Sequence, residues 1–313
     1  MKGDLEKSGY IFDLQRFSLH DGPGTRSTVF FKGCPLDCLW CHNPESISPQ
    51  LELGFDGREC VGCGRCFAAC PTEALRPDSS RESGRRYDPQ KCERCWECVD
   101  ACPSGALEVQ GREVTVKEVL AEVVPDRPFY ERSGGGVTLS GGEPTLQFEF
   151  CLALLKALKE EGISAALDTS GFASWEKLSQ LLPFLDLVLY DLKHTDSARH
   201  EELTGVGNER ILENLKRVDG AGGPIEVRIP LIPTCNDSKD NLKASAKLLG
   251  ELENLKRVRL LGYHRLGESK AWSFDRTRNA PEGVEPPTDR RMEGLVEFVR
   301  NEMERGDVEV SYR

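Results

Sequence analysis

The sequence contains no long apolar run, no excess of basic residues and no leader-like N-terminus. No uninterrupted apolar stretch in the 313 residues approaches the roughly 20 residues that a membrane-spanning helix requires. The 41 Lys and Arg residues are outnumbered by 52 Asp and Glu, and a net charge of −11 disfavours nucleic-acid binding. Charged residues interrupt the first 17 positions, so no signal peptide is expected. We therefore expect a cytoplasmic protein that binds neither membranes nor nucleic acids.

Cysteine, by contrast, is abundant and unevenly placed. The chain has 13 cysteines, and eleven of them fall between Cys34 and Cys102. In a reducing cytoplasm, cysteines gathered in so short a stretch are metal ligands rather than disulfides. The length allows one or two domains with a sizeable core.

The first cysteines follow a predicted buried strand, residues 26–32, with the spacing C-x3-C-x2-C: Cys34, Cys38 and Cys41. Three thiolates on so short a loop can hold three irons of a cubane iron–sulfur cluster. No fourth cysteine follows at a matching spacing, so one iron would stay open to a ligand that is not protein. An open position is typical of reactive rather than structural metal sites. A zinc loop or ordinary turn cysteines are the alternatives that three cysteines alone leave open.

The remaining clustered cysteines form an internal repeat of two copies, 32 residues apart. The copies are Cys60-x2-Cys63-x2-Cys66-x3-Cys70-Pro71 and Cys92-x2-Cys95-x2-Cys98-x3-Cys102-Pro103. This is the spacing of bacterial ferredoxins, in which the fourth cysteine of one copy ligates the other copy's cluster. The expected ligand sets are therefore Cys60, Cys63, Cys66 and Cys102, and Cys92, Cys95, Cys98 and Cys70. A zinc site is the weaker alternative because its cysteine pairs are separated by a longer loop.

The repeat divides the chain into three parts. We expect an N-terminal strand and cluster loop at 1–52, a ferredoxin-like insert at 53–110 and the rest of the main fold at 111–313. Within the insert, residues 76–90 are expected to be a surface linker. After it, apolar strands are predicted at 136–140, 163–168, 185–193, 225–232, 257–261 and 307–312. Helices are predicted between them, at 115–124, 148–161, 174–182, 209–219, 239–249 and 288–304.

Continuous apolar strands that alternate with helices of about ten residues indicate a parallel sheet covered by helices. Six strand–helix units, counted from the strand before Cys34, are compatible with a partial β/α barrel. A doubly wound sheet would give the same pattern. Ligands bind at the carboxyl ends of the strands in both architectures. The informative residues are therefore those that directly follow each strand.

The cluster loop and its flanks resemble a known family. The C-x3-C-x2-C loop with Trp40 before its last cysteine resembles that of radical S-adenosylmethionine (SAM) enzymes. The lead-in at 20–26, His-Asp-Gly-Pro-Gly-Thr-Arg, and the tail at 41–45, Cys-His-Asn-Pro-Glu, narrow the resemblance to glycyl-radical enzyme activating enzymes. It covers nearly the whole chain from about Phe17. It implies an α/β fold, a partial (β/α)6 barrel of the radical SAM type with an inserted bacterial-ferredoxin-like domain.

The resemblance also assigns residues to SAM. It implies contacts from Trp40, Cys41, His42, Gly141, Gly142, Glu143, Asp168, Asp191, Lys193, Arg228 and His264. The turn Gly141-Gly142-Glu143-Pro144 resembles the family's GGEP motif, which holds the methionine amino group. Lysine in such a place supplies a point charge for a carboxylate.

Each of these residues also has a simpler interpretation. Asp168, Asp191 and Lys193 could be solvated loop charges, Arg228 could form a structural ion pair, and His264 could be structural. We expect Cys151 and Cys235 to be ordinary buried cysteines. His194 and His200 are expected at the surface.

The function implied by the resemblance is that of a radical SAM oxidoreductase. SAM would be cleaved reductively to methionine and a 5′-deoxyadenosyl radical, which takes hydrogen from a glycine of a large partner glycyl-radical enzyme. The implied cofactors are SAM, three 4Fe–4S clusters, one of them with an open iron, and a monovalent cation near Asp168 and Asp191. We expect a monomer that receives electrons from flavodoxin or ferredoxin.

Two other functions remain open at this stage. One is a radical SAM enzyme that acts on another peptide or a small molecule. The other is an electron-transfer iron–sulfur protein, which would leave the Cys34 loop and the Gly141-Gly142 turn without a purpose. The insert could relay electrons, stabilise the fold or dock the partner.

Overall fold

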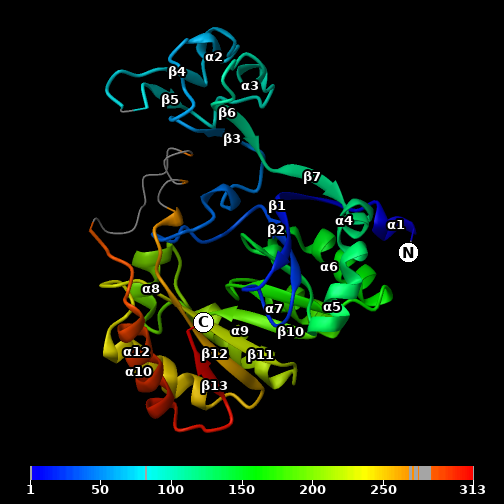
Figure 1. Cartoon of the computed structure of the whole chain (residues 1–313), viewed down its shortest axis with the longest axis vertical. Helices are drawn as coiled ribbons and strands as arrows, with labels where there is room; N and C mark the ends of the chain where they lie inside the picture. Colours follow the sequence, from blue (N-terminus) through cyan, green and yellow to red (C-terminus); the bar gives the residue numbers. More distant parts are fainter. Residues whose placement is uncertain (1, 82, 268–269, 271–273, 275–282, 313) are drawn as a thin grey trace.

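The computed structural model describes residues 2–81, 83–267, 270, 274 and 283–312. Its main feature is a nine-stranded sheet with the order β13-β12-β11-β10-β9-β8-β2-β1-β7. The bounds of these strands are β1 (Ser8–Ser18), β2 (Arg26–Phe31), β7 (Arg112–Thr115), β8 (Gly136–Gly141), β9 (Ala165–Thr169), β10 (Leu187–Asp191), β11 (Ile225–Leu231), β12 (Leu255–Gly262) and β13 (Glu309–Ser311). Figure 1 shows the sheet with its helices around it.

The parallel part of the sheet runs in strict chain order. From β2 through β8 to β13, each strand pairs in parallel with the next one along the chain. Crossovers between parallel strands are right-handed, so strands added always on the same side place their helices on one face. A doubly wound sheet would require the order to reverse, and here it does not. The fold is therefore the partial barrel of the radical SAM type, six units with β13 as a further edge strand.

The covering helices mostly lie where the apolar periodicity predicts them. They are α4 (Val116–Val123), α6 (Phe148–Glu160), α7 (Trp175–Leu181), α9 (Glu209–Gly220), α10 (Lys239–Gly250) and α12 (Asp289–Met303). Ser174, Ser238 and Thr288 begin three of them by accepting a hydrogen bond from a backbone N–H of the first turn. Their apolar faces and the strands form one continuous core.

Besides the short α1 (Lys2–Leu5), two helices in the described part of the main fold are absent from the sequence-based prediction. They are α5 (Arg127–Ser133) and α8 (Ser197–Thr204). α8 is mostly polar, so it lacks the apolar stripe that reveals a surface helix. The expectation that His194 and His200 lie at the surface is wrong. Their exposed fractions are 9% and 1%, because His200 hydrogen-bonds to the turn after α8 and His194 to Asp196 N–H.

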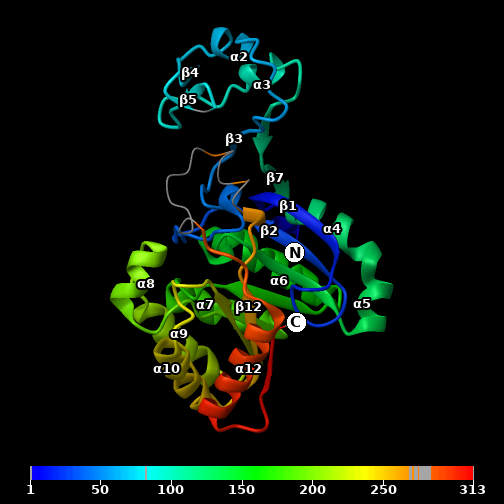
Figure 2. The same ribbon diagram turned by 60° about the vertical axis from the view of Figure 1, so that its left-hand side comes forward.

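Residues 52–110 lie outside the main sheet. β3 (Glu52–Phe55) pairs with β6 (Leu107–Gln110), and between them are α2 (Arg65–Ala68), β4 (Leu75–Pro77), β5 (Arg85–Tyr87) and α3 (Glu97–Asp100). A separate small core joins Leu53, Phe55, Leu75 and Leu107. The stretch predicted as a linker, 76–90, in fact carries the β4–β5 hairpin. This segment projects from one end of the barrel in both views (Figure 1, Figure 2).

Within the described residues, no helix combines the length and apolar character needed to cross a bilayer.

α1 (Lys2–Leu5) precedes β1, and the short 3-10 turn at Pro44–Ser46 follows the cluster loop. β1 and β7 add an antiparallel edge next to β2.

An ion pair between the exposed Arg16 and the buried Asp126 fixes this antiparallel edge to the barrel. Asp126 is 1% exposed and accepts hydrogen bonds from Arg16 Nε at 2.7 Å and Ser27 Oγ at 3.1 Å. The hydrogen bond from Arg16 lowers the pKa of Asp126 below its ordinary value and outweighs the opposing effect of burial. The ionised carboxylate is therefore the form that the fold stabilises.

We predict that Asp126→Asn lowers the free energy of unfolding at pH 7. The folded-state pKa lies below the unfolded value of about 4, so the stabilisation is present above that pH and is lost as the pH falls through the folded pKa. Urea unfolding at a series of pH values should show the mutant approaching wild type below about pH 3. Asp13→Asn, at an exposed position of β1, the strand that carries Arg16, is the control. A difference that stays constant over this range would contradict the prediction.

Candidate functional site

One cavity of about 450 Å³ opens at the carboxyl ends of the parallel strands. Its size is in the range of pockets for small organic ligands. The residues predicted for this site that line it are Cys34, Cys38, Trp40, Cys41, His42, Gly141, Gly142, Asp168, Asp191, Lys193, Arg228 and His264. They come from six strand ends that are far apart in the sequence. The structure therefore brings the predicted residues together, with the exception of the Glu143 side chain.

Backbone hydrogen bonds hold the loop that carries the three cysteines. Cys34 N–H donates to Ile47 O at 3.0 Å, and Cys41 N–H donates to Cys38 O at 3.1 Å. Asp37 and Leu39 N–H donate to the last turn of α8. α8, which the sequence did not reveal, thus anchors this loop from across the barrel.

The three thiols suit a cluster with an open iron. Burial, and next the neighbouring thiol of Cys38, raises the pKa of Cys34, and burial raises that of Cys38 to about 12 despite Lys193. Such thiols give up their protons when a metal binds. Cys34, Cys38 and Cys41 line a single cavity. In the described residues no three His, Cys, Asp or Glu side chains are arranged to hold one metal ion. The ligands of a cubane cluster do not need to converge on one ion, because each thiolate binds a different iron.

The two glycines of the second strand end are required by the backbone beside them. Gly141 has φ 101°, and a Cβ there would lie 2.6 Å from Phe31 N. A Cβ on Gly142 would lie 2.2 Å from Gly33 O. Gly142 N–H donates to Phe31 O at 2.9 Å, which joins the turn to the start of the cysteine loop. The glycines therefore set the distance between this turn and the thiols.

Glu143 supports the site without lining the cavity. Its side chain is fully buried and accepts hydrogen bonds from Thr169 Oγ1 at 2.9 Å and from Ser170 N–H at 2.9 Å. Ser170 Oγ donates a third at 2.6 Å, and Thr145 Oγ1 a fourth at 2.8 Å. The carboxylate thus ties the glycine turn to the end of β9, next to Asp168.

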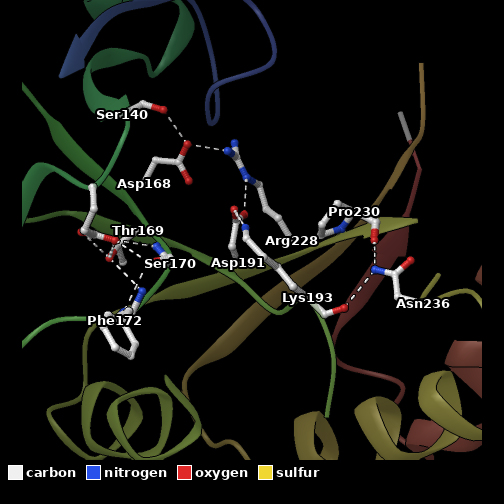
Figure 3. Close-up of polar contacts among 12 residues, drawn as sticks. Ser140, Asp168, Thr169, Ser170, Phe172, Asp191, Lys193, Arg228, Pro230 and Asn236 are labelled. Atoms are coloured by element: carbon white, nitrogen blue, oxygen red, sulfur yellow. Dashed lines mark hydrogen bonds and ion pairs between the residues drawn. The ribbon is translucent and has the colours of Figure 1, made fainter. Parts of the chain in front are cut away.

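A chain of charged side chains crosses the floor of the cavity. Figure 3 shows Arg228 reaching toward both Asp168 and Asp191. Arg228 Nη2 donates to Asp168 Oδ2 at 2.6 Å, and Lys193 Nζ donates to Asp191 Oδ2 at 2.6 Å. Ser140 Oγ adds a hydrogen bond to Asp168 at 2.6 Å. Two cations thus balance two anions in a nearly buried row.

The two carboxylates differ in their electrostatics. Burial, with a smaller contribution from Asp191, raises the pKa of Asp168 to about 6 although Arg228 opposes it. At Asp191 burial acts in the same direction, but Lys193 and Arg228 together outweigh it and lower the pKa. Arg228 Nε has no partner at hydrogen-bond distance, but it lies 3.7 Å from Asp191 Oδ1. The guanidinium of Arg228 therefore faces both carboxylates.

Flat side chains form the opposite wall. The imidazole rings of His42 and His264 stack with centroids 3.8 Å apart, and His42 Nε2 lies 3.2 Å from His264 O. Burial, and next the neighbouring His264, lowers the pKa of His42 to about 4, so its ring is neutral near pH 7. Trp40 packs beside them against Tyr263 and is 6% exposed. Such a wall can bind a planar heterocycle by stacking.

Other lining residues were missed by the sequence analysis. Asp21, Phe30, Ser140, Tyr263 and Tyr312 also line the cavity. Asp21 accepts a hydrogen bond from Thr28 Oγ1 at 2.9 Å, which draws the glycine-rich turn before β2 onto the rim. Its place in that turn was the available signal. Cys151 and Cys235 are buried, as expected.

The repeat cysteines lie outside this cavity, in the projecting segment. A second, smaller cavity is lined by Cys70, Cys92, Cys95 and Cys98, the set expected for one cluster. Cys66 lies close enough to Cys60 and Cys102 for their charges to interact, in line with the other set. Each fourth cysteine thus lies with the opposite copy.

Comparisons with known proteins agree with this geometry. The family model of the Radical SAM superfamily matches residues 28–245. The chain is 44% identical over 302 residues to the isethionate sulfite-lyase activating enzyme of Nitratidesulfovibrio vulgaris, covering 94% of this chain and 96% of that protein. It is 43% identical to the choline trimethylamine-lyase activating enzyme of Oleidesulfovibrio alaskensis, with coverage of 85% and 87%. It is 42% identical to the trans-4-hydroxy-L-proline dehydratase activating enzyme of Clostridioides difficile, with coverage of 91% and 94%.

We predict that Glu143→Ala weakens SAM binding while the protein keeps its iron. The change leaves buried donors on Thr169 and Ser170 without an acceptor, at about 1–3 kcal/mol for each. If that cost displaces the end of β9, SAM affinity should fall about tenfold or more. Titration of the iron-loaded protein with SAM measures the effect. Glu149→Ala, at a side chain 71% exposed, is the control, and equal affinities in both variants would rule out the positioning role.

Proposed function

This chain belongs to the radical SAM superfamily and, within it, to the glycyl-radical enzyme activating enzymes, and from that membership we propose how its residues divide the reaction. The family uses a 4Fe–4S cluster and SAM, and its protein substrate is a glycyl-radical enzyme. We propose that Cys34, Cys38 and Cys41 hold that cluster. The observation that carries the proposal is their convergence, with the charged row and the flat wall, on one cavity.

Held by Cys34, Cys38 and Cys41, the cluster would supply the one electron that cleaves SAM to methionine and a 5′-deoxyadenosyl radical, and this radical would take a hydrogen atom from glycine. The residues of the chain bind and orient SAM. Lys193 and Arg228 are the cations in the cavity that can pair with its carboxylate. The backbone carbonyls of Gly141 and Gly142 can accept hydrogen bonds from its amino group.

The remaining assignments follow from the shape of the cavity. His42, His264 and Trp40 form the wall against which the adenine can stack. Asp168 and Asp191 can accept hydrogen bonds from the ribose or supply oxygen ligands to a monovalent cation. With Cys41, which also borders this wall, and Glu143 as support, these residues form the proposed SAM site.

We extend the proposal to the segment that projects from the barrel. Its eight repeat cysteines suit two further 4Fe–4S clusters, for a total of three, and its small separate core supports an insert bounded at about 53–110. The insert would relay electrons from ferredoxin or flavodoxin to the SAM site. We propose that the chain works as a monomer, apart from its contact with the partner.

The partner itself is proposed only as a class. The relatives described above are activating enzymes of a sulfite-lyase, a trimethylamine-lyase and a dehydratase, at identities of 44%, 43% and 42%. Such equal similarity favours none of them. The structural requirement is that the partner's glycine lies on a segment able to reach the cavity at the strand ends.

The proposal is tested by mixing the reduced, iron-loaded protein with SAM and candidate glycyl-radical enzymes. Formation of 5′-deoxyadenosine together with a persistent glycyl doublet in electron paramagnetic resonance (EPR) spectra is the expected result. Production of 5′-deoxyadenosine with another molecule as the hydrogen donor would point to a different radical SAM substrate. No SAM cleavage at all would leave only an electron carrier.

We predict that Cys34→Ala, Cys38→Ala or Cys41→Ala each reduces SAM cleavage to background. Each change removes one of three iron ligands, and the loop offers no replacement thiol. The measurement is 5′-deoxyadenosine formed with dithionite as reductant. Cys151→Ala, which removes a buried thiol from α6, should cleave SAM at the wild-type rate. Cleavage retained in any of the three cluster-loop variants would move the site elsewhere.

A further inference from the structure

The two copies of the cysteine repeat differ at the positions between their cysteines. The first copy has Gly62 and Gly64 at φ 69° and 71°, a conformation that glycine adopts without steric cost. The second copy has Arg94 and Trp96 at the equivalent positions, at φ 57° and 64°. Residues with side chains rarely adopt this conformation, and when they do, the surrounding structure must hold them there. The second loop therefore keeps two unfavourable residues that the first copy shows to be dispensable for cluster ligation.

Arg94 anchors the second copy at the entry to the insert, and Trp96 covers it from within the insert core. Arg94 Nε donates to Leu51 O at 3.1 Å, at the point where the chain enters the insert. Trp96 packs into the insert core with Leu53 and lines the cavity that holds Cys70, Cys92, Cys95 and Cys98. Tyr87 lines the same cavity and hydrogen-bonds to Cys92.

The first copy is open by comparison. A Cβ at Gly62 would have no neighbour within 4 Å, and Cys60 and Cys63 are exposed. Val61 between them is 68% exposed. In the second copy, only Cys95 of the equivalent pair is exposed, and Cys92 is half-buried.

A buried contact links the anchored side of the insert to the cysteine loop of the barrel. Glu52 directly follows Leu51 at the start of β3, and its Oε2 lies 3.7 Å from Lys32 Nζ. Lys32 is fully buried, donates to Glu45 O at 2.5 Å and stands two residues before Cys34. In Figure 2, β3 and the chain that leads to β7 lie where the projecting segment meets the barrel. The second copy is therefore joined through Leu51, Glu52 and Lys32 to the first ligand of the SAM cluster.

We propose that the insert has a direction: the cluster held by Cys70, Cys92, Cys95 and Cys98 faces the SAM site and delivers the electron, and the cluster held by Cys60, Cys63, Cys66 and Cys102 receives it. This inference rests on the proposed function of the insert as a relay. One electron leaves a reduced ferredoxin or flavodoxin and reduces the outer cluster. The outer cluster, held by Cys60, Cys63, Cys66 and Cys102, would pass the electron to the inner cluster, held by Cys70, Cys92, Cys95 and Cys98. The inner cluster would pass it to the SAM cluster, where it would cleave one SAM. No proton is transferred along the path.

The test compares two matched variants of the full-length protein, Cys63→Ala/Cys66→Ala and Cys95→Ala/Cys98→Ala, by EPR. After full reduction with dithionite, the signal that shifts on addition of SAM belongs to the SAM cluster. Magnetic coupling to the inner cluster should speed the relaxation of that signal in wild type. The Cys95/Cys98 variant should lose this enhancement, and the Cys63/Cys66 variant should retain it. The reverse pattern, equal losses, or no coupling in wild type would overturn the proposal.

Single serine variants cover the case in which an alanine pair prevents the insert from folding. A serine oxygen can still bind iron, so Cys63→Ser and Cys95→Ser keep a ligand at each corner. Cys95→Ser should alter the relaxation of the SAM-responsive signal, and Cys63→Ser should leave it unchanged; any other pattern counts against the assignment. 5′-Deoxyadenosine made with dithionite is recorded in parallel. Its absence in wild type would refute the proposed function, whereas its presence without the expected coupling would refute only the direction.

Discussion

The whole arrangement depends on one constraint, the strict chain order of the parallel strands. Because the parallel strands β2 and β8 to β13 are added on the same side, all their carboxyl ends lie on one rim. A cysteine loop, a glycine turn and four polar strand ends must then share that rim. Burying their charges there is costly unless the charges are paired. Arg228 pairs with Asp168 of another strand, and Lys193 pairs with Asp191 of its own strand end. The register that pairs Asp191 with Arg228 on adjacent strands meets this requirement.

The charged row on the rim is balanced by its own members. Two cations and two carboxylates neutralise each other. The ammonium and carboxylate of an amino-acid ligand also cancel each other, so together these two groups add no net charge to the row. Glu143 supports the row from outside the cavity. It accepts hydrogen bonds from groups that follow β8 and β9, and these bonds hold the two strand ends at a fixed separation. Preorganisation of this kind lowers the reorganisation required when a ligand binds.

Much of the fold could be predicted because its signals are local. The apolar periodicity of α6 and α9 and the capping serines and threonines identify helices within one or two residues of their observed ends. The cysteine spacings likewise identify the metal-binding loops without reference to the rest of the chain. The buried positions of His194 and His200 and the anchoring role of α8 were not predictable in this way. The anchoring role of α8 depends on contacts between segments more than 100 residues apart, such as Leu39 with Leu203, that leave no periodic trace. The two histidines are held by hydrogen bonds to nearby backbone groups, which apolar periodicity does not reveal either. Glu143 shows the same limit: its motif marked it as important, but only the packing shows that its side chain turns away from the cavity.

The repeat in the insert shows how identical ligand spacing can coexist with different roles. Cysteine positions decide only that a cluster binds, and they are the same in both copies. Burial, access and connection to the barrel are decided by the residues between them. Gly62 and Gly64 have no side chains, so they leave the first loop uncovered. Arg94 and Trp96 attach and cover the second loop, although their positive φ angles are unfavourable for residues with side chains. If the two clusters had the same reduction potential, the insert itself would not favour electron transfer toward the SAM site over transfer away from it. An asymmetry of burial and hydrogen bonding changes the potential of a cluster, so the same substitutions that anchor the second copy can also give the path its direction.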